Sequence, residues 1–220
     1  MFVTLVSILV AGLSAGGSSP STELRVTFIG NMAFHLTDGT VALLTDFPYE
    51  SGAFGYMDWS KSSVPTGPAP ICVISHSHAD HFSPKLAREF CGRIVGPNDV
   101  VEASGVEVLE LKPEARWEGL TITAFPTPHG SLEHYSFLIE WRGKRLYLTG
   151  DTEDTGPLLA ARNLDVAFVS PWLLEAIQKN GGHIDAHQVV VYHHRNGEAV
   201  PKIQNRILPT QGQVLSLGKR

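Results

Sequence analysis

The chain has 220 residues, 43% of them hydrophobic and 18% charged, and its formal net charge is −5. This composition is typical of a well-packed globular protein and excludes an intrinsically disordered chain. Because the net charge is acidic and no basic run exceeds two residues, we expect no nucleic-acid partner.

The first 21 residues have the layout of a secretory signal. An apolar run from Phe2 to Leu13 is followed by small residues and by a Gly/Ser tract that ends at Ser21. This run is shorter than the roughly 20 apolar residues that span a bilayer, so we expect no stable membrane anchor. We predict that residues 1–21 form a signal peptide and linker, and that the protein is exported to the periplasm or secreted. Because no Lys or Arg precedes Arg25, a cytoplasmic protein with a buried N-terminal strand is the alternative.

From Glu23 onward, short apolar or alternating runs are separated by Gly, Pro, Asn and Asp. Runs rich in β-branched and aromatic residues predict strands, and runs with helical spacing predict helices. The last of these helices has Ser170 as its N-cap and Pro171 at its first position. Two strands are joined by a Gly-containing hairpin, and residues 48–70 form a long loop of the kind that often acts as a lid. Along the chain, the expected strands are residues 24–30, 41–47, 71–75, 105–111, 120–125, 135–141 and 144–150, and the expected helices are residues 83–90, 97–104, 155–163 and 170–180.

Cys72 and Cys91 are the only cysteines, which excludes a disulfide-rich scaffold. Cys72 lies inside an apolar run typical of a buried strand, which is a poor position for a metal ligand or a nucleophile. We expect two buried free thiols, with a single disulfide as the alternative in an oxidising compartment.

Four potential metal ligands, His76, His78, Asp80 and His81, lie within six positions directly after an apolar run. Loops at strand ends are where catalytic groups sit on a rigid scaffold. Imidazole and carboxylate groups without a thiolate suit Zn²⁺, Fe or Mn²⁺ in an open catalytic site rather than a closed structural zinc site. A chance cluster of surface histidines is the alternative, and it is a poor explanation in a chain with only ten histidines.

Further candidate ligands follow other apolar runs, and each would be an ordinary loop residue if taken alone. They are His129, Asp151 and the adjacent pair His193 and His194. Successive side chains of a strand point to opposite faces, so only one histidine of the pair can face a site. Strand geometry alone leaves open which of the two it is.

The order of these pieces resembles the metallo-β-lactamase superfamily of metal-dependent hydrolases. The segment HSHADH, a strand-end histidine, a strand ending in TGDT and a late strand-end histidine carry the resemblance. It extends from Glu23 to the C-terminus, and the stretch VTFIGNMAFHLTDGTVALLTDF is similar to the broad branch of lactonase-like and N-acylphosphatidylethanolamine phospholipase-D-like proteins. The implied fold is of the α/β type, a four-layer αβ/βα sandwich with the site at one edge of two facing sheets, and residues 22–220 would form this single domain.

The resemblance also implies two divalent metal ions, with Zn²⁺ expected and Mn²⁺ or Fe as alternatives. The reaction it implies is hydrolysis of an ester, lactone, amide or phosphodiester by a metal-bound hydroxide, on a small-molecule or lipid-like substrate. Asp80 would be the catalytic residue that orients the nucleophile and carries its proton. The implied ligands are His76, His78 and His129 for the first ion, Asp80, His81 and His193 for the second, and Asp151 as the bridge.

Other interpretations stay open at this point. A non-catalytic metal-binding or interaction protein on the same fold is the second functional hypothesis. Redox chemistry is a third, which His78 disfavours because the oxidoreductase branch carries Glu there. His134 either contacts the substrate or is a hydrogen-bonded strand residue. Asp46 either orients a ligand histidine or is a turn residue. The sequence leaves the substrate and the oligomeric state undetermined.

Overall fold

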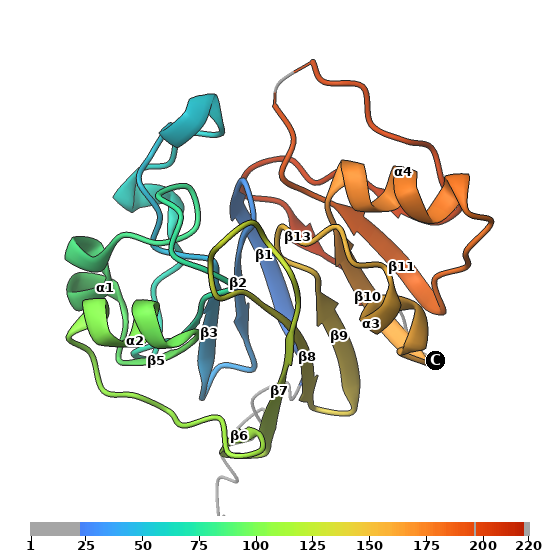
Figure 1. Ribbon diagram of the computed structural model, residues 1–220. Coiled ribbons are helices and arrows are strands. Elements are labelled where there is room, and N and C mark those ends of the chain that lie inside the picture. The colour runs from blue at the N-terminus through green and yellow to red at the C-terminus, as the bar shows by residue number, and fades with distance from the viewer. Residues whose placement is uncertain (1–22, 196, 218–220) are drawn as a thin grey trace, which may run out of the picture.

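The computed structural model describes residues 23–195 and 197–217, and the predicted signal segment lies outside these ranges. Within them, two β-sheets face each other and helices lie on their outer sides (Figure 1). None of the helices in the described part of the chain is both long and apolar enough to cross a membrane.

The first sheet has six strands, in the order β13 (Val214–Leu215), β1 (Arg25–Gly30), β2 (Ala33–Thr37), β3 (Ala42–Thr45), β4 (Ile71–Val73) and β5 (Arg93–Val95). Strands β3, β4 and β5 are parallel, and the other pairs are antiparallel. The loop between β3 and β4 contains two short 3-10 helices, η1 (Ala53–Gly55) and η2 (Lys61–Ser63). Helix α1 (Pro84–Phe90) precedes β5 and helix α2 (Asn98–Ser104) follows it.

The second sheet has seven strands, in the order β12 (Arg206–Ile207), β11 (Ala186–Val191), β10 (Leu164–Val169), β9 (Lys144–Leu148), β8 (Tyr135–Trp141), β7 (Leu120–Pro126) and β6 (Ala115–Trp117). Strands β9 to β12 are parallel, and β6 to β9 form an antiparallel meander. Helix α3 (Gly156–Ala160) and helix α4 (Pro171–Lys179) belong to this half of the fold.

Three clusters of buried apolar side chains fill the spaces between four layers. One cluster lies between the two sheets and includes Phe34 and Phe168. The second joins the first sheet to α1 and α2, with Ala87 among its members. The third joins the second sheet to α3 and α4 through Leu158 and Leu174. The predicted four-layer αβ/βα sandwich is therefore confirmed.

Strand β10 shows how the sequence builds these layers. Val166 and Phe168 contribute to the cluster between the sheets, whereas Ala167 and Val169 contribute to the cluster with α4. All six residues of the strand are buried. A strand covered on both faces needs apolar side chains at successive positions, so β10 carries four consecutive apolar residues, residues 166–169, instead of an alternating pattern.

The four predicted helices are present, and Ser170 and Pro171 occupy the expected first positions of α4. The hairpin between β8 and β9 turns through Arg142 and Gly143, both with positive φ. The strand predicted at residues 105–111 is wrong, because this segment forms only one isolated bridge, between Val108 and Ile94. Its contact with β5 consists of two backbone hydrogen bonds at a single residue, from the N–H of Ile94 to the carbonyl of Glu107 and from the N–H of Leu109 to the carbonyl of Ile94.

The prediction of two free thiols is also wrong, because Cys72 and Cys91 form a disulfide. Cys72 lies on β4, and Cys91 follows α1 just before β5. Because β5 pairs with β4, the chain just before β5 returns to the side of β4, and the Cα atoms of Cys72 and Cys91 lie 5.7 Å apart. Disulfides are typical of proteins in oxidising compartments, which is the setting that the export prediction requires.

We predict that reduction of this disulfide destabilises the protein. The bridge closes a loop with a sequence separation of 19, and a loop of this size stabilises the folded state by about 3 kcal/mol, chiefly by restricting the unfolded chain. Urea unfolding of metal-free protein with and without reductant measures this difference. The stability of the Cys91→Ala variant should not change with reductant. Detection of two free thiols in unfolded wild-type protein that was never reduced would contradict the bridge.

Candidate metal centre

The predicted ligands come together at one edge of the sandwich. Strands β7, β9 and β11 run in the same direction in the second sheet, and His129, Asp151 and His193 follow their carboxyl ends. The loop with His76 follows β4 of the opposite sheet. Carboxyl ends of strands are common locations for functional groups in such folds, because the loops there are free to vary while the sheets hold them in place.

The loop after β4 is fixed by a buried carboxylate. Asp46 accepts hydrogen bonds from the backbone N–H of Ser75 at 2.6 Å and from its hydroxyl at 3.1 Å. The loop then turns tightly, since the backbone N–H groups of His81 and Phe82 both donate to the carbonyl of His78. This turn presents several side chains of the HSHADH segment to the same space.

A first cluster consists of His76, His78 and His129. His76 Nε2 lies 2.9 Å from His78 Nδ1, and His129 Nε2 lies 3.3 Å from the same atom. His129 Nδ1 lies 3.2 Å from the main-chain carbonyl of Asp151, so that nitrogen donates to the backbone and leaves Nε2 directed at the cluster. This cluster is open to solvent on the side of His78.

A second cluster consists of Asp80, His81 and His193, all buried. His81 Nε2 lies 3.2 Å from His193 Nε2 and 3.6 Å from Asp80 Oδ2, and His193 Nε2 lies 3.3 Å from the same oxygen. Asp151 Oδ2 lies 3.1 Å from His193 Nε2 and 3.3 Å from His81 Nε2. Asp151 also groups with His76 and His81 within 4.8 Å, so it stands between the two clusters.

The donor set fits a pair of divalent ions. Ligand atoms about 2.1 Å from a tetrahedral zinc ion lie about 3.4 Å from one another, which is close to the separations in both clusters. All donors are imidazole nitrogens or carboxylate oxygens, the set that Zn²⁺, Fe and Mn²⁺ accept. Asp151 Oδ1 is buried and has no hydrogen-bond partner among the described residues, as expected for an oxygen that an ion would satisfy.

Electrostatics distinguish the two clusters. Burial, together with the charge of His81, lowers the pKa of His76, and burial with the charge of His129 lowers the pKa of His78. Both imidazoles are therefore neutral at neutral pH and can offer a lone pair without losing a proton.

The second cluster is an ion-pair network instead. Burial alone would lower the pKa of His81 and of His193, but the carboxylate of Asp151 outweighs it and raises both, with Asp46 adding to the effect on His81. Burial opposes ionisation of Asp151, yet the charges of His81 and His193 hold its pKa well below the usual range. An ion bound here has to displace imidazole protons.

The structure decides two interpretations that the sequence leaves open. Asp46 Oδ2 lies 3.3 Å from His81 Nδ1, an arrangement that orients the ring so that Nε2 faces the cluster. His134 has both ring nitrogens engaged: Nδ1 lies 2.8 Å from Thr127 Oγ1, and Nε2 accepts a hydrogen bond from the backbone N–H of Asp151 at 2.9 Å. His134 is therefore a hydrogen-bonded residue that positions the Asp151 turn, and a direct contact with substrate is disfavoured.

The structure also separates the adjacent histidines. His193 takes a positive φ of 56° and turns its ring into the second cluster. His194 Nδ1 lies 3.3 Å from the carbonyl of Arg195, and among the described residues His194 belongs to neither cluster. The positive φ is the bend that two adjacent strand-end histidines need to diverge in this way.

Sequence reasoning missed Asn31, which ties the two sides of the site together. Its side-chain amide N–H donates to the main-chain carbonyl of Asp80 at 2.9 Å. The main-chain carbonyl of Asn31 accepts from the backbone N–H of His193 at 3.2 Å. Tyr192 was missed as well, and its hydroxyl accepts from the backbone N–H of Gly150 at 3.1 Å. Neither residue carries a ligand-type signal in the sequence. The turn signal of Gly30-Asn31 was the only indication available.

A family model described as Beta-lactamase superfamily domain matches residues 62–202. The chain belongs to the metallo-β-lactamase superfamily. No curated protein sequence matches the chain. The match with the family extends from η2 in the β3–β4 loop past the last predicted ligand, so it includes the whole HSHADH segment.

Solved structures share the metallo-β-lactamase fold with this chain at low sequence identity. The metallo-β-lactamase fold protein YhfI from Bacillus subtilis has a TM-score of 0.62 and 14% identity, over 88% of this chain and 100% of that chain. A metallo hydrolase from the archaeon Ignicoccus hospitalis has a TM-score of 0.60 and 17% identity, over 87% and 97%. An isothiocyanate hydrolase from Delia radicum gut bacteria has a TM-score of 0.61 and 15% identity, over 87% and 98%.

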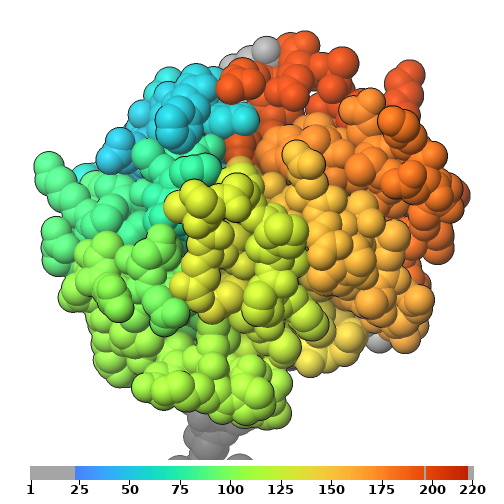
Figure 2. All heavy atoms as spheres, in the orientation of Figure 1, coloured from blue at the N-terminus to red at the C-terminus, as the bar shows by residue number. Residues whose placement is uncertain are grey.

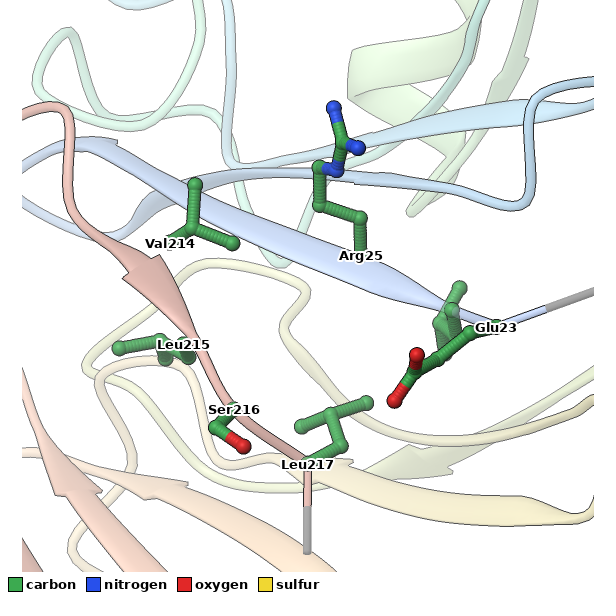
Figure 3. A pocket seen from close by; sticks show the side chains of 7 residues that line it. Glu23, Arg25, Val214, Leu215, Ser216 and Leu217 are labelled. Carbon is green, nitrogen blue, oxygen red and sulfur yellow. The ribbon is translucent and has the colours of Figure 1, made fainter. Parts of the chain in front are cut away.

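A separate pocket of about 240 Å³ lies far from the candidate centre of this metallo-β-lactamase-fold protein. Figure 3 shows its lining, from the start of β1 and from β13, including Arg25 and Leu217. The pocket lies at the start of β1, whereas Asn31, which bonds to Asp80 of the centre, follows the end of the same strand. The pocket and the centre are therefore separated by roughly 20 Å, the length of β1. The pocket contains none of the predicted ligands.

We predict that Gly150→Ala disrupts the centre. Gly150 has φ of +60°, and a Cβ there would lie 2.3 Å from His134 Nε2 and 3.0 Å from Ser75 Cβ. The left-handed backbone and the collision together should lower the free energy of unfolding by about 2–4 kcal/mol and displace Asp151. The control is Gly143→Ala, with φ of +72° and no atom within 4 Å of its Cβ, which should lose only about 1 kcal/mol. Chemical denaturation and metal content measure both effects, and equal losses in the two variants would contradict the role of the collision.

We predict that acid removes the ion of the second cluster first. His81 and His193 have raised pKa values, so they hold protons that an ion must displace, whereas His76 and His78 have lowered pKa values and hold none near neutrality. Affinity at the second cluster should fall about tenfold per pH unit for each displaced proton. Zinc titrations against a chelator between about pH 8 and pH 6 measure this affinity. The His78→Ala variant changes the first cluster, so the second cluster should keep its steep pH dependence in it. Loss of the first-cluster ion at the higher pH would refute the assignment.

Proposed function

We propose that the protein is a hydrolase that uses two divalent metal ions, with zinc as the resident metal. The observation that carries the proposal is the position of the Asp151 carboxylate. It lies 3.1–3.3 Å from His193 and His81 of the second cluster and also groups with His76 of the first cluster within 4.8 Å. The substrates that fit this chemistry are esters, lactones, amides or phosphodiesters of small or lipid-like molecules.

The residues divide between the ions as the geometry groups them. His76, His78 and His129 would hold the first ion, Asp80, His81 and His193 the second, and Asp151 would contribute to both. When bound, the ions supply Lewis-acid polarisation of a carbonyl or phosphoryl oxygen and allow water to ionise near neutral pH. The solvent-open side at His78 gives a substrate access to this pair.

Asp80 is the residue of the chain that we assign to proton transfer. Burial opposes its ionisation, but the hydrogen bond with His193 and the charge of His81 lower its pKa, so the carboxylate is ionised at neutral pH and can accept a proton. The amide of Asn31 holds the Asp80 backbone at 2.9 Å and thereby fixes where this carboxylate points. A fixed, ionised carboxylate beside the ions suits the role of orienting a water nucleophile.

Two further observations support a hydrolase over the alternatives. All seven predicted ligands converge, which a non-catalytic protein of the same fold would not need. Two of the structures that share the fold are named as hydrolases, although their low identity supports the fold alone. The presence of His78, where the oxidoreductase branch carries Glu, disfavours redox chemistry.

Metal analysis combined with an activity panel tests the function. The purified protein should bind two zinc ions, hydrolyse at least one class in a panel of esters, lactones, amides and phosphodiesters, lose activity with a chelator and regain it with zinc. Asp80→Ala should reduce turnover by about 10²–10⁴-fold at saturating zinc. The matched control is Asp99→Ala, at an exposed position in the first turn of α2. A stable maximum of one ion, or near-normal turnover in Asp80→Ala, would reject the mechanism.

We predict that the adjacent histidines differ in their effect on metal binding. His193→Ala should weaken the second ion by about 10–100-fold or more, because even the loss of groups that only orient ligands has effects of that size. His194→Ala should retain both ions, because its ring lies outside the clusters. Zinc titration of each variant is the measurement, and the reverse pattern would show that His194 closes the site.

A further inference from the structure

Two segments far apart in the sequence meet beside the metal centre. One is the β3–β4 loop around η1, and the other is the loop after β11. Figure 1 places η1 across from the loop that follows β11, and Figure 2 shows the two segments in contact at the top of the molecule. The guanidinium of Arg195 donates to the carbonyl of Phe54 at 3.2 Å, across 141 positions of the chain.

The two segments, residues 53–56 and residues 194–195, form a rim beside the centre. Aromatic rings pack between this rim and a predicted ligand. The ring of Tyr56 packs edge-on against His193 with centroids 4.1 Å apart, and Trp172 packs against the same imidazole at 5.1 Å. Phe54 is 63% exposed, and its ring centroid lies 6.3 Å from that of His78. The rim therefore borders both clusters.

The rim also carries a fixed positive charge. The guanidinium carbon of Arg195 lies 4.6 Å over the ring of Tyr56, a cation–π contact. Because Tyr56 contacts His193, these two contacts place the guanidinium within about 9 Å of the His193 ring. The carbonyl of Phe54 and the ring of Tyr56 hold the group in position, so little side-chain entropy is lost when it binds a ligand.

The charge of Arg195 has no carboxylate partner within the described part of the chain. The nearby Glu198 accepts from the backbone N–H of Arg195 at 2.8 Å instead of pairing with its guanidinium. Arg195 is exposed. Its contacts with the ring of Tyr56 and the carbonyl of Phe54 leave further guanidinium N–H donors available to solvent. A guanidinium fork of this kind matches a carboxylate or phosphate group bidentately.

We propose that Arg195, supported by Tyr56, is a specificity subsite that binds an anionic group on the non-reacting part of the substrate. The inference rests on the proposed hydrolase function and narrows its substrate class to anionic esters, lactones or amides. The anion is a carboxylate or a phosphate, held a few bonds from the group that reaches the metal ions. Tyr56 acts as a positioning residue through its ring.

Binding of product-like acids to zinc-loaded protein tests the subsite without turnover. Succinate and 3-phosphonopropionate carry a second anion, and butyrate is a matched acid that lacks it. By calorimetry, at least one of the two diacids should bind about 10–100-fold more tightly than butyrate, the size expected for a charge-assisted contact. The comparison between the two diacids distinguishes a carboxylate subsite from a phosphate subsite.

Matched variants assign the effect to Arg195. Arg195→Gln should reduce the diacid-to-butyrate affinity ratio to below about 3-fold, and Arg195→Lys should restore part of it. Tyr56→Phe should retain the ratio because the ring remains, whereas Tyr56→Ala should lower it. The control is Arg162→Gln, at an exposed arginine that donates to the carbonyls of Leu159 and Ala161.

The outcomes also separate the subsite from the function. A ratio near one in the wild-type protein, a ratio unchanged by Arg195→Gln, or no binding of any acid would overturn the subsite. An Arg195-dependent ratio in a protein that hydrolyses nothing in the panel would reject the hydrolase function and leave the anion site standing. Hydrolysis of neutral esters without an Arg195-dependent ratio would reject the subsite alone.

Discussion

The site depends on one buried charge contact, between the carboxylate of Asp151 and the imidazoles of His81 and His193. His81 comes from the loop after β4 of one sheet, whereas Asp151 and His193 follow strands of the other. Unpaired, a buried carboxylate would cost several kcal/mol, so the two sheet edges have to supply its partners. This requirement fixes the distance between the edges and so determines where both ligand clusters lie.

The backbone around that contact is held in unusual conformations. Asn31, Asp46 and His193 have positive φ, and so does Gly150. Each such non-glycine residue costs on the order of 1 kcal/mol or more, and residues of this kind persist where surrounding contacts over-determine them. Here those contacts are the hydrogen bonds of Asn31 to Asp80 and of Asp46 to Ser75. Part of the backbone strain of the described residues thus lies at the edge where the proposed chemistry would occur.

The rim continues the same construction outward from the ligands. His193 contacts Tyr56, Tyr56 supports Arg195, and Arg195 bonds to the loop that carries Phe54. The side chain proposed to close the second cluster is thus packed against the proposed binding surface. Under the two proposals, ligand geometry and substrate selection would be connected through these ring contacts.

Much of the site and fold follows from local sequence. The HSHADH segment after an apolar run, the strand-end positions of His129 and Asp151, and the four helices are signals carried by neighbouring residues. Such signals predict elements and ligand types well because backbone propensity and side-chain periodicity act over a few positions. Strand β10 was not predicted, because a short run of consecutive apolar residues, here residues 166–169, does not distinguish a strand from a buried helix by its periodicity.

Only the tertiary structure decided the remaining features. The Cys72–Cys91 disulfide, the hydrogen bonds of His134, the tie made by Asn31 and the pairing of Arg195 with the η1 segment all join residues that are distant along the chain. The choice of His193 over His194 was predicted from the family resemblance, in which the last ligand is the first polar residue after a short apolar strand. The positive φ that turns the ring inward belongs to the folded backbone. The sequence alone thus determined which chemical groups are present and on which elements they lie. Packing of the two sheets decided which of them meet, because contacts across the sandwich leave no periodic signal in the chain.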